Sequence, residues 1–285
     1  MNGLKNKVRN IKHKSHQGFT MLELILVIII MGIMAVGISG FITLSTQTYL
    51  NATNRDELIG NARFVIERLS RELRNALPNS IRIKTFGTRQ CIQFTPIDAS
   101  TIYTDIPVLP ELASKELSVI PFKDDITDTS YLFKSGDLVT VYPLKAGDIY
   151  ADSSGVLGKI FQVDTVNSLT PGVIELINSS GVNFEQDSPT QRLYITNQQV
   201  SYCYNYVISA NVGTLVRFSD AITSGSQTYP TSTHSYMAGY LTSDQPFNYQ
   251  PATLQRNAVV QIHFKFTKED ENYVFDHEVH INNVP

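Results

Sequence analysis

The feature that most constrains this chain is an uninterrupted apolar stretch near its N-terminus. Residues 24–44 read LILVIIIMGIMAVGISGFITL, which is 21 residues without a charged side chain. As an α-helix this stretch would be roughly 31 Å long. That length matches the hydrocarbon core of a bilayer, about 30 Å thick. We therefore expect a single membrane-spanning helix over about residues 24–44.

Charge is distributed unevenly along the chain. The first 18 residues carry a net charge of +5, and the rest of the chain holds 18 basic and 26 acidic residues, a net of −8. Basic residues beside a span favour its cytoplasmic side, so we interpret residues 1–18 as a cytoplasmic leader. The acidic remainder argues against non-specific nucleic-acid binding, which depends on neutralising phosphates. The basic residues of the leader are Lys5, Lys7, Arg9, Lys12 and Lys14.

The junction between the leader and the apolar helix has an unusual pattern, Gly18-Phe19-Thr20-Met21-Leu22-Glu23. An ordinary secretory signal would have a shorter apolar stretch followed by a small-residue cleavage site, and this chain departs from both. A glycine before Phe19 leaves an unhindered peptide bond, and a cut there would give Phe19 a new α-amino group. Glu23 is a carboxylate at the edge of an apolar segment, where a fully immersed charge is costly. The amine and Glu23 offer complementary charges, within one chain or between neighbours.

The segment GFTMLELILVIIIMGIMA, which begins at Gly18, resembles the class III signal of type IV pilins and pseudopilins. The resemblance implies cleavage between Gly18 and Phe19 by a prepilin peptidase and N-methylation of Phe19. It implies that Glu23 acts in filament assembly by neutralising the N-terminal amine of an adjacent subunit. Two departures, the 18-residue leader and Gly40 where many major pilins carry a kinking proline, argue against a typical major pilin.

The resemblance also implies a location and a set of partners. We expect a single-pass protein of the bacterial inner membrane, with its C-terminal domain in the periplasm, that enters a pilus after assembly. The expected partners are the prepilin peptidase, other major and minor pilins, the inner-membrane assembly platform and the lipid bilayer. We expect no cofactor and no nucleic-acid partner.

The helical pattern continues beyond the membrane segment as an amphipathic helix over about residues 54–77. Pro78 cannot continue a helix without losing a backbone hydrogen bond, so we expect one pilin helix over 19–77. The apolar residues recur at spacings of three and four, which is typical of one buried helix face. They are Leu58, Ala62, Val65, Ile66, Leu69, Leu73, Ala76 and Leu77.

Residues 78–285 change to short runs that are typical of strands, so we expect an α+β protein with a β-rich, antiparallel periplasmic domain. The clearest pair is a hairpin in which apolar residues alternate from Val260 to Phe266 and again from Tyr273 to Ile281. Residues 219–257 are rich in Ser, Thr, Gln and Tyr and are expected to form a long surface loop. The aromatic residues of this loop either contact a glycan or a neighbouring subunit, or simply cover the core. They are Tyr229, Tyr236, Tyr240, Phe247 and Tyr249.

The two cysteines, Cys91 and Cys203, both follow the membrane segment. In an oxidising compartment such a pair favours a disulfide, and two free buried thiols are the alternative. Their spacing, without a CxxC or a Cys/His ligand pattern, argues against zinc. The three histidines of the final hairpin do not favour a metal site either, because His277 and His280 should point to opposite faces of one strand.

Motifs of catalysis are missing from the sequence: it contains no P-loop, GxSxG, HExxH or dinucleotide fingerprint. We therefore expect a structural protein and not an enzyme. Within the pilin class, the run from Glu67 to Ser80 and the C-terminal segment from His277 resemble a minor pilin of an MSHA-like type IV pilus, which implies a role in priming assembly at or near the filament tip. The alternatives are a J-type pseudopilin of type II secretion, a type IVa minor pilin, or, from another class, a membrane-anchored glycan-binding adhesin.

Overall fold

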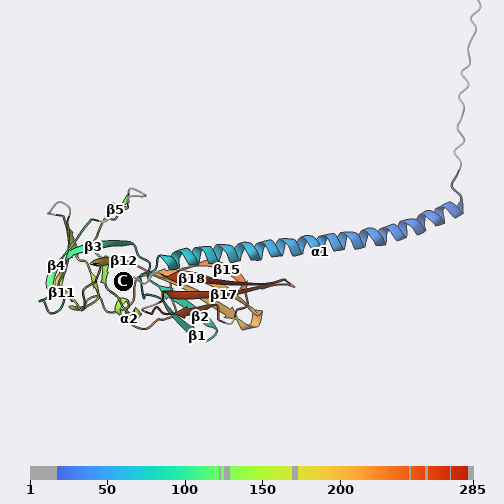
Figure 1. Ribbon diagram of the computed structural model, residues 1–285. Coiled ribbons are helices and arrows are strands. Elements are labelled where there is room, and N and C mark those ends of the chain that lie inside the picture. Colours follow the sequence, from blue (N-terminus) through green and yellow to red (C-terminus); the bar gives the residue numbers. More distant parts are fainter. Residues whose placement is uncertain are drawn as a thin grey trace, which may run out of the picture. The chain divides into compact units, whose positions relative to one another are not determined.

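The computed structural model describes residues 18–121, 123–124, 129–168, 173–243, 245–253, 256–269 and 271–281 (Figure 1). The expected leader therefore lies outside the described residues, except for Gly18. The chain divides into two compact units, residues 1–53 and 54–285. A long N-terminal helix followed by antiparallel sheets confirms the expected α+β class.

Helix α1 runs from Met21 to Arg74. Its apolar stripe becomes buried from Leu58 onward, and the buried members are Leu58, Ala62, Val65, Leu69 and Leu73. The helix ends before Pro78 because the chain changes partner, with the backbone N–H of Leu77 donating to the carbonyl of Thr95 at 2.7 Å. Arg71 and Arg74 lie in the last turn, where positive charge complements the helix dipole.

The first sheet contains eight strands and is antiparallel throughout. The buried stripe of α1 packs on one face of this sheet and forms the main core with Phe94, Tyr202 and Phe264. Its strands, in sheet order, are β1 (Arg82–Phe86), β2 (Arg89–Phe94), β13 (Gln199–Val207), β14 (Val212–Asp220), β15 (His234–Leu241), β17 (Ala258–Lys268) and β16 (Phe247–Gln250), with β18 (Glu271–Ile281) also paired to β17. A short 3-10 helix, η1 (Ile208–Ala210), joins β13 to β14.

The expected C-terminal hairpin is present as β17 and β18, which pair along their full lengths from Ala258↔Ile281 to Lys268↔Glu271. On β17 the residues Val260, Ile262, Phe264 and Phe266 are buried, because alternate side chains of a strand face the same side. The pairing reaches Lys268↔Glu271, so both strands extend beyond the alternating runs Val260–Phe266 and Tyr273–Ile281.

The second sheet also contains eight strands and has a core of its own, which includes Leu117, Phe161 and Phe184. In sheet order its strands are β10 (Thr165–Asn167), β11 (Ile174–Phe184), β4 (Ser114–Val119), β3 (Ala99–Asp105), β12 (Arg192–Thr196), β7 (Leu138–Val141) and β9 (Ile160–Gln162), with β8 (Leu157–Gly158) pairing in parallel with β11. Two short strands, β5 (Lys123–Asp124) and β6 (Thr129–Ser130), pair separately.

The second sheet is an insertion between two neighbouring strands of the first. Strands β2 and β13 pair directly, from Phe94↔Val200 to Arg89↔Asn205. The chain between them, residues 95–198, leaves the first sheet, builds the second and returns (Figure 1). The body is therefore one sheet packed on α1 plus an inserted β-rich unit.

The junction between the two sheets is formed by the short helix α2 (Ala146–Ile149). Ile149 and Tyr150 pack with Leu77 and Tyr194 in a small apolar cluster. The Tyr150 hydroxyl donates to the carbonyl of Ser80 at 3.0 Å. These contacts connect the end of α1 to the inserted unit.

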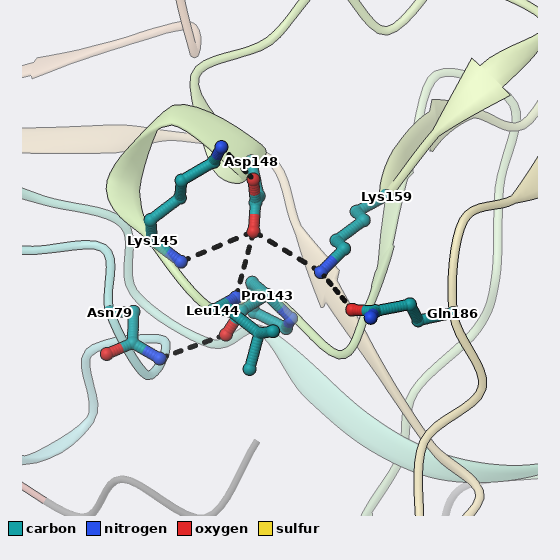
Figure 2. Close-up of polar contacts among 7 residues, drawn as sticks. All are labelled: Asn79, Pro143, Leu144, Lys145, Asp148, Lys159 and Gln186. Atoms are coloured by element: carbon teal, nitrogen blue, oxygen red, sulfur yellow. Dashed lines mark hydrogen bonds and ion pairs between the residues drawn. The ribbon is translucent and has the colours of Figure 1, made fainter. Parts of the chain in front are cut away.

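A buried ion pair supports α2, as Figure 2 shows. The Asp148 carboxylate accepts from the backbone N–H of Leu144 at 2.9 Å and lies 3.5 Å from the Lys159 ammonium. The Lys159 ammonium also donates to the Gln186 side chain at 2.9 Å. The side chains of Asp148 and Lys159 are only 9% and 5% exposed. Because each charge has a partner, the cluster is a structural support, consistent with the rarity of unpaired buried charges.

The expectation of one long loop over residues 219–257 is wrong in part. The segment contains β15 and β16, and β15 pairs with β14. Met237, Ala238 and Leu241 are buried there, although polar residues and tyrosines surround them in the sequence. This segment becomes a strand because it pairs with β14. The local composition does not reveal that partner. The segment 221–233 has no strand or helix.

Candidate functional site

The Gly18–Phe19 junction lies outside the helix. Residues 18–20 have no regular secondary structure and are exposed, and the Phe19 side chain is 79% exposed. A Cβ atom added at Gly18 would meet no atom within 4 Å. The folded chain therefore does not itself require glycine at this position. A requirement for Gly18 would come from an enzyme that must bind the junction.

Thr20 directly precedes α1. Its hydroxyl accepts from the backbone N–H of Glu23 at 3.3 Å, and its carbonyl accepts from the backbone N–H of Leu24 at 3.2 Å. A threonine that satisfies an otherwise free N–H of the first turn is an N-cap. Sequence reasoning missed this role. The signal was present, because Thr-x-x-Glu is the pattern of a capping box.

Glu23 occupies the first turn of α1 and is exposed. Its carboxylate has no hydrogen bond or ion pair with any residue that the structure describes. The positive end of the helix dipole favours a carboxylate at this position. Glu23 is thus compatible with two roles, a contribution to the start of the helix and pairing with a charge outside its own chain.

The apolar part of α1 is not covered by other described residues of the chain. Every residue from 18 to 50 is exposed. Within the described parts of the chain, α1 is the one helix that is long and apolar enough to cross a membrane. An exposed surface of this composition is unfavourable in water and favourable in lipid.

Cys91 and Cys203 are direct partners on β2 and β13. They form a disulfide with an S–S distance of 2.06 Å, and both residues are 0% exposed. The bond joins the two strands from which the inserted unit departs and to which it returns. Gln227 lies over this position and donates from its side chain to the Cys91 carbonyl at 3.2 Å.

The aromatic residues of segment 219–257 have different environments. Phe247 is buried in the main core, and Tyr249 packs against that core. Tyr229 packs edge-to-face on Phe86 and Phe218. These three cover the core, whereas Tyr236 is 63% exposed.

The predicted site residues belong to different units of the chain. Gly18, Phe19 and Glu23 belong to the first unit, and the cysteines belong to the second. Among the described residues, no group of three His, Cys, Asp or Glu side chains could hold a metal ion. On the final hairpin, His263 contacts Asp276 at 2.5 Å, while His277 is half-buried and His280 is exposed.

Comparison with known proteins gives one match. Residues 13–39 match the family model described as the prokaryotic N-terminal methylation motif. No curated protein and no solved structure matches the chain. The matched segment contains the Gly18–Phe19 junction, Glu23 and the first part of α1. The motif implies processing by a prepilin peptidase, association with other pilins and anchoring in a membrane, and it supports a type IV pilin-like, structural protein.

Proposed function

We propose that the protein is a minor pilin of an MSHA-like type IV pilus, which enters the filament at or near its tip and primes assembly. The observation that carries this proposal is the methylation motif at residues 13–39, directly followed by the exposed apolar helix. In this proposal a prepilin peptidase cuts between Gly18 and Phe19, Phe19 is N-methylated, and the body faces the periplasm.

The size of the body supports a minor subunit. Besides the sheet that packs on α1, it carries the complete inserted unit between β2 and β13. A subunit that repeats along a filament must leave room for identical neighbours on all sides. The inserted unit would crowd such a lattice if every subunit carried it, and it is acceptable at a tip.

The MSHA assignment rests on sequence resemblance. The run from Glu67 to Ser80 resembles the MSHA minor pilin MshO, and the segment beginning at His277 does so more weakly. A J-type pseudopilin or a type IVa minor pilin would use the same α1. The genes next to this one would separate a pilus from a type II secretion system.

The cleavage proposal is tested with Gly18→Leu. Since a side chain at this position meets no atom of the folded chain, the variant should insert and fold normally but keep residues 1–18. Intact mass of the protein from membranes measures this. Gly37→Leu is the matched control, because a Cβ there also meets nothing within 4 Å. Normal maturation of the Gly18 variant would refute the peptidase assignment.

The role of Glu23 is tested by comparing Glu23→Ala with Glu23→Gln. Glutamine can take the place of glutamate in a capping box but has no charge. If pairing with an N-terminal amine is the function, both variants should insert into the membrane and both should be depleted from sheared filaments. Wild-type incorporation of Glu23→Gln, with loss only in Glu23→Ala, would show that helix capping and not charge is needed.

A further inference from the structure

A cavity lies on the face of the first sheet opposite α1, between the ends of β13 and β14 and the irregular segment 221–232. Its volume is about 330 Å³, at the small end of the range of ligand pockets, roughly 300–1,000 Å³. Its lining comes from Gln93 on β2, Gln199 on β13, Asp220 at the end of β14 and residues of the segment 221–232.

The two glutamines of the cavity are buried and held in place. Gln93 is 2% exposed, accepts from Arg82 at 2.6 Å and donates to Ser201 at 3.0 Å. Gln199 is 5% exposed and donates to the Thr223 hydroxyl at 3.2 Å. A side-chain amide nitrogen carries two hydrogens, and these contacts use one on each glutamine. Each glutamine therefore keeps a second N–H donor beside the cavity.

Other polar groups around the cavity have no partner among the residues that the structure describes. The half-buried Asp220 carboxylate makes no hydrogen bond or ion pair with them. The hydroxyl groups of Thr228, Thr231 and Ser232 also line the cavity and form no hydrogen bond with a described residue. A carboxylate accepts only, whereas a hydroxyl donates and accepts. The lining thus offers both kinds of partner to one polar ligand.

An aromatic wall completes the cavity. The Tyr229 ring packs on Phe86 and Phe218, and its hydroxyl donates to Asn205 at 2.8 Å. The Arg89 guanidinium lies 4.7 Å from the ring centre. Because these contacts hold the ring in place, little side-chain freedom is lost when a ligand packs against it.

We propose that this cavity binds one or two units of a neutral saccharide. A sugar ring presents hydroxyl groups, which both donate and accept, together with C–H faces that pack on an aromatic wall. None of the lining residues is basic, and Asp220 is the one acid among them. An anionic ligand would meet the Asp220 carboxylate and no basic side chain in the lining itself, and a divalent cation would find a single carboxylate, fewer than such ions usually take.

The experiment uses the full-length protein in lipid nanodiscs, since detergents with sugar headgroups would compete for the cavity. Binding is measured by saturation-transfer NMR and titration with glucose, galactose, mannose, N-acetylglucosamine and lactose, with sialic acid as the acidic probe. We expect a neutral sugar to bind, and Asp220→Ala to weaken it about tenfold or more, as expected for loss of a hydrogen bond to a charged group. Asp105→Ala, an exposed carboxylate on β3, should bind as wild type.

A second variant covers the case in which Asp220→Ala does not fold. Thr228→Trp places a large side chain at the exposed rim of the cavity and should abolish binding while thermal unfolding is unchanged. The proposal would be overturned by absence of binding to all neutral probes, or by wild-type affinity in both cavity variants. Preference for sialic acid, or loss of binding on chelation, would also overturn it. Filament incorporation of the two variants should stay at wild-type level, so this test is separate from that of the pilin assignment.

Discussion

Glu72 joins the end of α1 to the first sheet, and its removal gives the sharpest test of that packing. Its carboxylate accepts from Arg217 on β14 at 3.0 and 3.2 Å and from Arg68, one turn earlier, at 3.1 Å. The side chains of Glu72 and Arg217 are 20% and 17% exposed. The carboxylate therefore serves two guanidinium groups, one of them from a strand 145 residues away in the chain.

The contacts of Glu72 with Arg217 and with Arg68 should contribute unequally to the free energy of unfolding. A hydrogen bond between charged groups with limited exposure contributes about 1.5–3 kcal/mol. The Arg68 contact is an i,i+4 pair with Arg68 33% exposed, and such pairs contribute about 0.3–0.5 kcal/mol. Arg217 keeps some access to water when its partner is lost, which favours the lower end of the range. Glu72→Ala should thus reduce the free energy of unfolding by about 2 kcal/mol.

The measurement is thermal unfolding of the full-length protein followed by near-UV circular dichroism. A loss of 2 kcal/mol should lower the Tm by about 4–8 °C for a domain of this size. Glu67→Ala is the matched control, because Glu67 is an exposed acid on the same helix without an ion pair to any described residue. It should leave the Tm nearly unchanged. Equal shifts for both variants would refute the view that Glu72 connects α1 to the sheet.

Two further predictions concern the body. Replacing both Cys91 and Cys203 by alanine removes a disulfide between residues 112 apart in the sequence. This should lower the free energy of unfolding by up to about 4–5 kcal/mol, and a Tm equal to wild type would contradict it. Burial raises the pKa of the Tyr150 phenol from 10.0 to about 12. Below pH 10 the phenol is protonated in both states, whereas between pH 10 and about 12 only the unfolded chain releases the proton, so stability should fall as the pH rises through this window. Tyr150→Phe should flatten that fall in pH-dependent melts, and an unchanged slope would contradict it.

The local patterns of the sequence predicted the first part of the chain well. The uncharged stretch 24–44 predicted a helix from its length and composition, and the stripe from Leu58 to Leu73 predicted its continuation from residues three and four apart. Both signals are local. The final hairpin was equally accessible, since alternation along β17 and β18 is a local signal. The same locality made Thr20 recognisable as a cap, although its role was read only from the structure.

The inserted unit, strand β15 and the cavity could be recognised only from the tertiary structure. That residues 95–198 form an insertion follows from the pairing of β2 with β13, a contact between positions far apart in the chain that no local pattern records. The strand β15 was hidden because its partner β14, and not its own composition, determines it. The cavity beside Asp220 likewise needs β2, β13, β14 and the segment 221–232 together. The sequence by itself determined the anchor and its processing motif, because these depend on neighbours along the chain; the arrangement of the body depends on neighbours in space.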